Sequence, residues 1–114
     1  MALVVSDFDA LSEEALNELS RQLIDQGCVY LCCWGIGCER FHDLFDQQWI
    51  NGGFDPQSTD TIMTTWHANE SLEGFLRFGL FFTEPSCGFR ERCNTTSVIV
   101  INDSATVEKI RAVL

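Results

Sequence analysis

The stretch Cys28–Cys38, with the sequence CVYLCCWGIGC, decides the fold of this chain. Residues 29–34 form an apolar run without charge, with Gly27 before it and Gly35 after it. A run of this length, rich in β-branched and aromatic residues, predicts a strand that is buried on both faces. Both faces then need cover, and helices are the usual cover in a parallel sheet.

The two faces of this strand follow from the alternation of its side chains. Leu31 and Cys33 are expected on one face, and Tyr30 and Cys32 on the other. Four of the chain's six cysteines lie within or beside this strand. We expect them to act as small buried apolar residues rather than as a disulfide framework.

Strand and helix patterns alternate along the rest of the chain. Further strands are predicted at residues 3–5, 61–66 and 98–101. Helices are predicted after Ser12, from Cys38 to Asn51, from a cap at Asn69 to Phe82, and after Asp103 or Ser104. This order predicts a single α/β domain over residues 1–114: a small three-layer sandwich, Rossmann-like or flavodoxin-like, with helices on both faces of a mainly parallel sheet of three or four strands. The pattern leaves open whether the N-terminal strand forms an antiparallel edge.

The charge balance is strongly acidic, and it restricts the class of partner. The chain has 17 acidic and 7 basic residues, which gives a formal net charge of -10. Such a surface repels phosphate backbones, so we expect no direct nucleic-acid binding. No segment approaches the ~20 apolar residues of a membrane span, and the first residues do not resemble a signal peptide. We therefore expect a cytosolic protein with reduced cysteines and no membrane contact.

In an open parallel sheet, ligands bind beyond the carboxyl ends of the strands. That rule selects the loops at residues 34–39, 64–70 and 102–104, and the first two contain or adjoin both histidines of the chain. The candidate pocket consists of the chemically versatile side chains in these segments, namely Trp34, Cys38, Glu39, His42, Asp43, Thr65, Trp66, His67 and Glu70.

The turn Gly35-x-Gly37 between a strand and a helix resembles part of a dinucleotide-binding motif. The third glycine of that motif would fall at Arg40, and Glu39 would place negative charge beside a pyrophosphate. We therefore favour an ordinary strand–helix turn, and we expect no bound cofactor.

Cys38 and His42 are four residues apart, so they share one face of a helix. With His67 they form a candidate zinc constellation that lacks the paired spacing of specific zinc motifs. Alternatively, Cys38 at the helix start is a candidate nucleophile, with His67 as its base and Asp43 or Glu70 as the orienting carboxylate. A half-buried cysteine with surface histidines is the simpler interpretation, and the catalytic residues stay unassigned.

Two acidic pairs, a cysteine-containing loop and two phenylalanines are the remaining candidate functional features. The acidic pairs are Asp43 with Asp46 and Glu70 with Glu73, and a solvated helix face is favoured for them over acid–base or divalent-metal chemistry. The loop from Cys87 to Cys93 contains Arg90 and Arg92, and its two cysteines form a disulfide only in an oxidising environment. Exposed Phe81 and Phe82 would suit a dimer contact.

Two functional hypotheses remain. The first is an acidic cytosolic protein without catalysis that binds another macromolecule, a protein with a basic surface, in the manner of immunity proteins, antitoxins and inhibitors. It follows from the small size, the charge of -10 and the lack of a complete catalytic motif. The alternative is a small-molecule-binding domain or enzyme with its site around Trp34, Cys38, His42 and His67.

Overall fold

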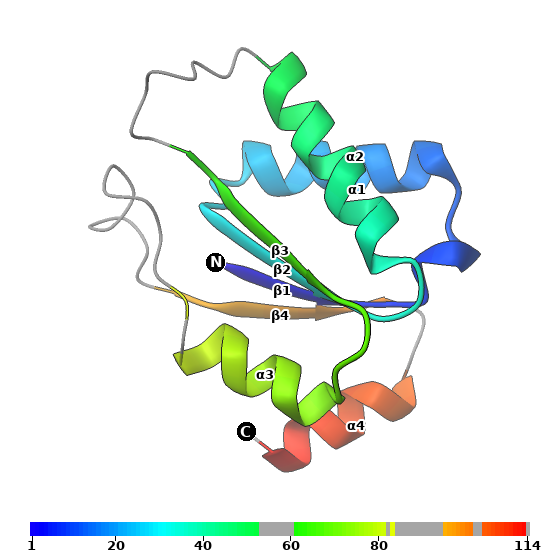
Figure 1. The fold of residues 1–114 in the computed structure, drawn as a ribbon, viewed down its shortest axis with the longest axis vertical. Helices are drawn as coiled ribbons and strands as arrows, with labels where there is room; N and C mark the ends of the chain where they lie inside the picture. The colour runs from blue at the N-terminus through cyan, green and yellow to red at the C-terminus, as the bar shows by residue number, and fades with distance from the viewer. Residues whose placement is uncertain (53–60, 82, 84–94, 102–103, 114) are drawn as a thin grey trace.

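The central feature of the structure is a four-stranded parallel sheet with the strand order β3-β2-β1-β4 (Figure 1). The computed structural model describes residues 1–52, 61–81, 83, 95–101 and 104–113. The strands are β1 (Ala2–Val5), β2 (Tyr30–Trp34), β3 (Met63–His67) and β4 (Ser97–Val100), and every neighbouring pair is parallel. The predicted Rossmann-like or flavodoxin-like α/β fold is confirmed.

Helices cover both faces of this sheet. The helices α1 (Glu13–Asp25) and α2 (Cys38–Asn51) lie on one side, whereas α3 (Leu72–Phe81) and α4 (Ser104–Val113) lie on the other (Figure 1). A short 3-10 helix, η1 (Phe8–Ala10), follows β1 and packs near the start of α2. Three layers are the expected outcome when strands are buried on both faces.

The strand β1 lies inside the sheet. The sequence left open whether it forms an antiparallel edge, and it does not, because it pairs in parallel with β2 on one side and with β4 on the other. All four of its residues are buried. An apolar strand without alternation is suited to such a central position.

Two hydrophobic clusters show that the faces of β2 were predicted correctly. Leu31 and Cys33 belong to the cluster beneath α1 and α2, while Tyr30 and Cys32 belong to the cluster beneath α3. Cys32, Cys33 and Cys38 carry free thiols in the structure, and all three are buried. The role of these cysteines in the core is that of compact apolar side chains.

The helix starts are set by local capping. The Ser12 hydroxyl accepts a hydrogen bond from the Ala15 amide at 3.1 Å, as expected for the residue before α1. The start of α3 differs from the prediction, because Ser71 rather than Asn69 accepts the bond from the Gly74 amide, at 3.0 Å. Serine and asparagine are both good caps, so the sequence alone did not separate them.

The turn after β2 packs closely against the turn after β1. The Ser6 amide donates to Trp34 O at 3.2 Å, and the Phe8 amide donates to Ile36 O at 2.7 Å. Gly35 has a φ of +125°, and a side chain there would overlap the Ser6 carbonyl oxygen. These contacts bring the carboxyl ends of the two central strands to one rim.

None of the described helices is long and apolar enough to cross a membrane. Phe81 is exposed at the end of α3. The predictions for Phe82, for the loop from Cys87 to Cys93 with its two arginines, and for Asn102 and Asp103 concern residues outside the described part of the chain.

Candidate functional site

Trp34 and His67 lie side by side at the carboxyl-end rim of the sheet. They are register partners on the parallel strands β2 and β3. The Trp34 indole Nε1 donates a hydrogen bond to the Glu70 backbone oxygen at 2.8 Å, which ties the loop after β3 to β2. The expectation that these two side chains share a rim is therefore met.

Alternation along β3 divides the predicted site between two faces. Thr64 and Trp66 face α2, whereas Thr65 and His67 face α3, where His67 contacts aromatic side chains. Of the predicted pocket residues, Cys38, Glu39, His42, Asp43 and Trp66 lie on the α2 side, and Thr65, His67 and Glu70 lie with Trp34 on the α3 side. The structure therefore contains two small groups in place of one pocket.

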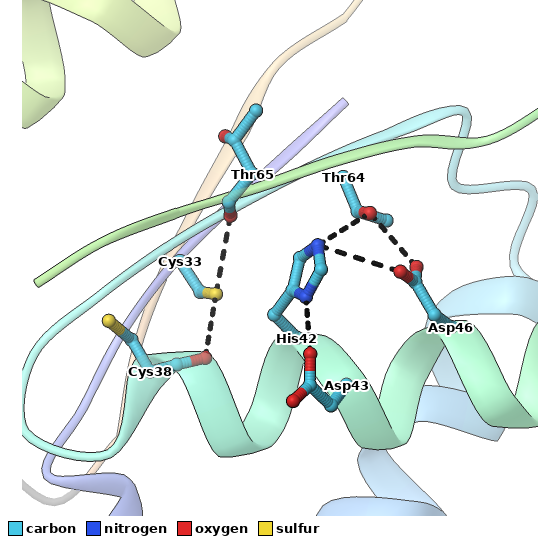
Figure 2. Close-up of polar contacts among 7 residues, drawn as sticks. All are labelled: Cys33, Cys38, His42, Asp43, Asp46, Thr64 and Thr65. Carbon is cyan, nitrogen blue, oxygen red and sulfur yellow. Dashed lines mark hydrogen bonds and ion pairs between the residues drawn. The ribbon is translucent and has the colours of Figure 1, made fainter.

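The first group is a hydrogen-bonded network around His42 (Figure 2). His42 Nδ1 lies 2.9 Å from Asp43 Oδ1, and His42 Nε2 lies 2.9 Å from Thr64 Oγ1. The Thr64 hydroxyl donates to Asp46 Oδ1 at 2.9 Å, and Asp46 Oδ2 lies 3.5 Å from His42 Nε2. The residues of this network come from one face of α2 and from β3, which lies at one edge of the described sheet.

The donors and acceptors of this network can be assigned from their chemistry. Ionised carboxylates only accept hydrogen bonds, so the single hydroxyl proton of Thr64 goes to Asp46. The Thr64 oxygen then faces His42 Nε2 as an acceptor, while His42 Nδ1 faces the Asp43 carboxylate. Both ring nitrogens therefore point at acceptors, and the ring holds one carboxylate on each side.

The second group is a chain of contacts through His67. Its Nε2 lies 3.0 Å from Thr65 Oγ1, and its Nδ1 lies 2.9 Å from Glu70 Oε2. Hydroxyl, imidazole and carboxylate follow one another in the order found in hydrolase triads. However, the ring is only 6% exposed and packs against Phe75 and Phe78, with ring centroids 5.1 and 4.7 Å away.

The cysteines beside these groups are poor nucleophiles. Burial raises the pKa of the Cys33 thiol well above its ordinary range, and it raises that of Cys32 to about 11. Cys33 Sγ lies 3.3 Å from Cys38 O and 3.4 Å from Thr65 O, so its weak donor has acceptors within reach (Figure 2). The Cys38 side chain is buried in the core.

The combinations that the sequence suggested for Cys38 are not assembled. His67 lies across β3 from Cys38 and His42, so neither the zinc constellation nor the cysteine–histidine pair forms. Within the described part of the chain, no group of three or more His, Cys, Asp or Glu residues is arranged to hold a metal ion. His42 is instead engaged with Thr64 and its two carboxylates.

The part that Thr64 plays in this network was not predicted from the sequence, and that of Asp46 was underestimated. The spacing of His42 and Asp46 on one helix face was a usable signal, because residues four apart are neighbours on a helix. Nothing in the sequence indicated that Thr64 would lie opposite them, since that depends on how α2 packs across β3.

The parallel strand order and the helices that alternate with the strands define a small α/β protein of the Rossmann-like and flavodoxin-like architecture. A family model described as a domain of unknown function, DUF7684, matches residues 1–114, and the chain belongs to that family. No curated protein and no solved structure matches the chain.

Proposed function

We propose that this protein acts by binding a basic surface of another protein through the layer formed by η1, α1 and α2. The observation that carries the proposal is the sorting of charge between the two helical layers. Exposed or half-buried carboxylates are concentrated on one side of the sheet, and we call this surface the acidic layer: Asp7, Asp9, Glu13, Glu14, Glu18, Asp25, Glu39, Asp43 and Asp46.

The two arginines of the acidic layer do little to offset its charge. Arg21 pairs with Glu18 at 2.8 Å, and this hydrogen bond lowers the pKa of the Glu18 carboxyl. Arg40 is exposed but is directed toward η1, where it donates to Phe8 O at 3.2 Å and to Leu11 O at 3.3 Å. Most carboxylates of the layer therefore face solvent without a cationic partner among the described side chains.

In the described part of the chain, the two helices of the opposite layer are nearly neutral. The helices α3 and α4 carry the basic residues Arg77, Lys109 and Arg111 against the acidic residues Glu73 and Glu108. Two of these charges pair within each helix, at 3.7 Å between Arg77 and Glu73 and at 3.5 Å between Arg111 and Glu108. A field of one sign on one side of a molecule orients it as it approaches a partner of opposite charge.

The test begins with capture of a partner from an extract of the encoding organism. Affinity is then measured between the two purified proteins at low and at physiological salt. We expect a partner with a basic surface, and binding that weakens about tenfold as salt is raised. Glu14→Gln/Glu18→Gln should weaken binding further, whereas the matched double variant Glu73→Gln/Glu108→Gln should not. Salt-independent binding, or equal losses in both variants, would refute the proposal.

A second candidate function is a small-molecule site at the rim. It is favoured by the adjacency of Trp34 and His67 and by the chain from Thr65 through His67 to Glu70. The two candidates respond differently to substitution: His67→Ala alone should abolish activity at a rim site, while Glu14→Ala and Glu18→Ala should cause graded losses in docking.

A further inference from the structure

Trp66 is a large aromatic side chain at the border of the acidic layer. It is 44% exposed. It lies on β3, which pairs only with β2 among the described strands and therefore forms one edge of the sheet. Exposed tryptophans are costly to leave in water, and they are enriched among the residues that dominate binding energy at protein interfaces.

Two carboxylates contact the histidine that packs against this tryptophan. The His42 ring lies with its centroid 4.6 Å from that of Trp66, and it contacts Asp43 and Asp46 on its two sides. The side chain of Asp43 is 68% exposed and that of Asp46 is 40% exposed, so both carboxylates still face solvent. Their hydrogen bonds to His42 and Thr64 fix their positions before any partner arrives.

The charges around Trp66 and His42 favour the approach of a cation. Among the described residues, Asp43 and Asp46 both contact His42, which gives two carboxylates for one imidazole. Glu39 lies one helical turn before Asp43 on the same side of α2 and adds further negative charge. Arg40 is directed away to η1.

We propose that Trp66, Asp43 and Asp46 receive an arginine side chain of the basic partner, and that this contact is the centre of the interface. The inference rests on the proposed function and says where on the acidic layer the partner is recognised. A guanidinium group stacks on an indole face and also donates to carboxylates in its own plane. Lysine offers a compact charge without the planar stacking surface, so arginine fits this combination better.

The test uses a capped peptide of alternating arginine and serine as the probe, with the full-length protein. Binding is followed by the indole NMR signals of the three tryptophans and by chemical shifts along α2 and β3. We expect the shifts to centre on Trp66 and α2, and we expect the matching lysine peptide to bind more weakly.

Affinity for the arginine peptide is then measured in variants. Trp66→Ala should weaken it about threefold, and Asp43→Asn/Asp46→Asn about fivefold. Asparagine keeps the shape of the aspartate side chain, and Trp66→Phe should recover part of the affinity lost in Trp66→Ala because it keeps an aromatic face. Unfolding midpoints of all variants confirm that they are folded.

The control Glu14→Gln/Glu18→Gln removes the same number of charges from the acidic layer but leaves the surroundings of Trp66 intact. A clearly smaller loss in this control supports the inference. If both double variants lose affinity equally and Trp66→Ala binds normally, the proposed contact centre is wrong while charge-driven docking stands. If no cationic peptide binds at low salt, the proposed function itself fails.

Discussion

Replacing Gly35 by alanine should destabilise the fold strongly, because two separate costs meet at this residue. Its φ of +125° is unfavourable for a residue with a side chain, and this strain costs about 1–2 kcal/mol. The added methyl group would also overlap the Ser6 carbonyl oxygen. A backbone atom cannot rotate away as a side chain can, so relieving the overlap costs about 1–3 kcal/mol more.

Gly27→Ala is the matched control for the first of these costs. Gly27 also has a positive φ, of 88°, but a side chain there would meet nothing within 4 Å. Gly27→Ala should therefore lower the free energy of unfolding by only about 1–2 kcal/mol, against about 2–5 kcal/mol for Gly35→Ala. The difference between the two variants measures how closely the turns after β1 and β2 approach each other.

Urea denaturation followed by circular dichroism provides the assay. With a slope of about 1–3 kcal/mol per molar urea, the expected loss shifts the midpoint of Gly35→Ala by about 1 M or more. A small domain has a total stability of about 5–15 kcal/mol, so most of this range can be measured. Equal midpoints for the two variants would refute the close packing of Gly35 against Ser6.

Thr64→Val should lower the free energy of unfolding by about 1–2 kcal/mol, because it removes the hydroxyl between His42 and Asp46 and leaves a buried ring nitrogen with a poorer partner. Urea denaturation of this variant beside the exposed control Thr96→Val tests the prediction. Equal stability of the two variants would contradict it. Alkaline pH should also destabilise the protein. Burial raises the pKa of Cys32 from 9.0 to about 11, so in this range the unfolded chain has released a proton that the folded chain retains. Stability should be full below pH 9 and then fall by about 1.4 kcal/mol per pH unit for this thiol. Cys32→Ala should have a shallower urea-midpoint profile, and an identical profile would count against the buried thiol.

The order of strands and helices was predictable because it depends on local signals. The apolar run between Gly27 and Gly35, and the cap at Ser12, act over a few residues and are visible in the sequence. The position of β1 at the centre was not visible, because it depends on pairing between Ala2 and Ser97. Contacts between residues so far apart along the chain leave no periodic pattern.

The division of the candidate site into two groups has a similar cause. The predicted strand ended at Trp66, which left His67 in a loop that was free to reach toward His42. In the structure, β3 extends to His67, so this side chain takes the face opposite to that of Trp66. Since side chains alternate with a period of two, one extra strand residue is enough to move a histidine across the sheet.

The central place of β1 also affects how the protein is made. Of the four described strands this one is synthesised first, yet one of its two neighbours, β4, begins only at Ser97. At about 5–20 residues per second, translation leaves that edge of β1 unpaired for roughly 5–20 s. Among the described strands, β4 therefore joins the nascent sheet last, and until then the apolar residues of β1 depend on β2 and the first helices for protection from aggregation.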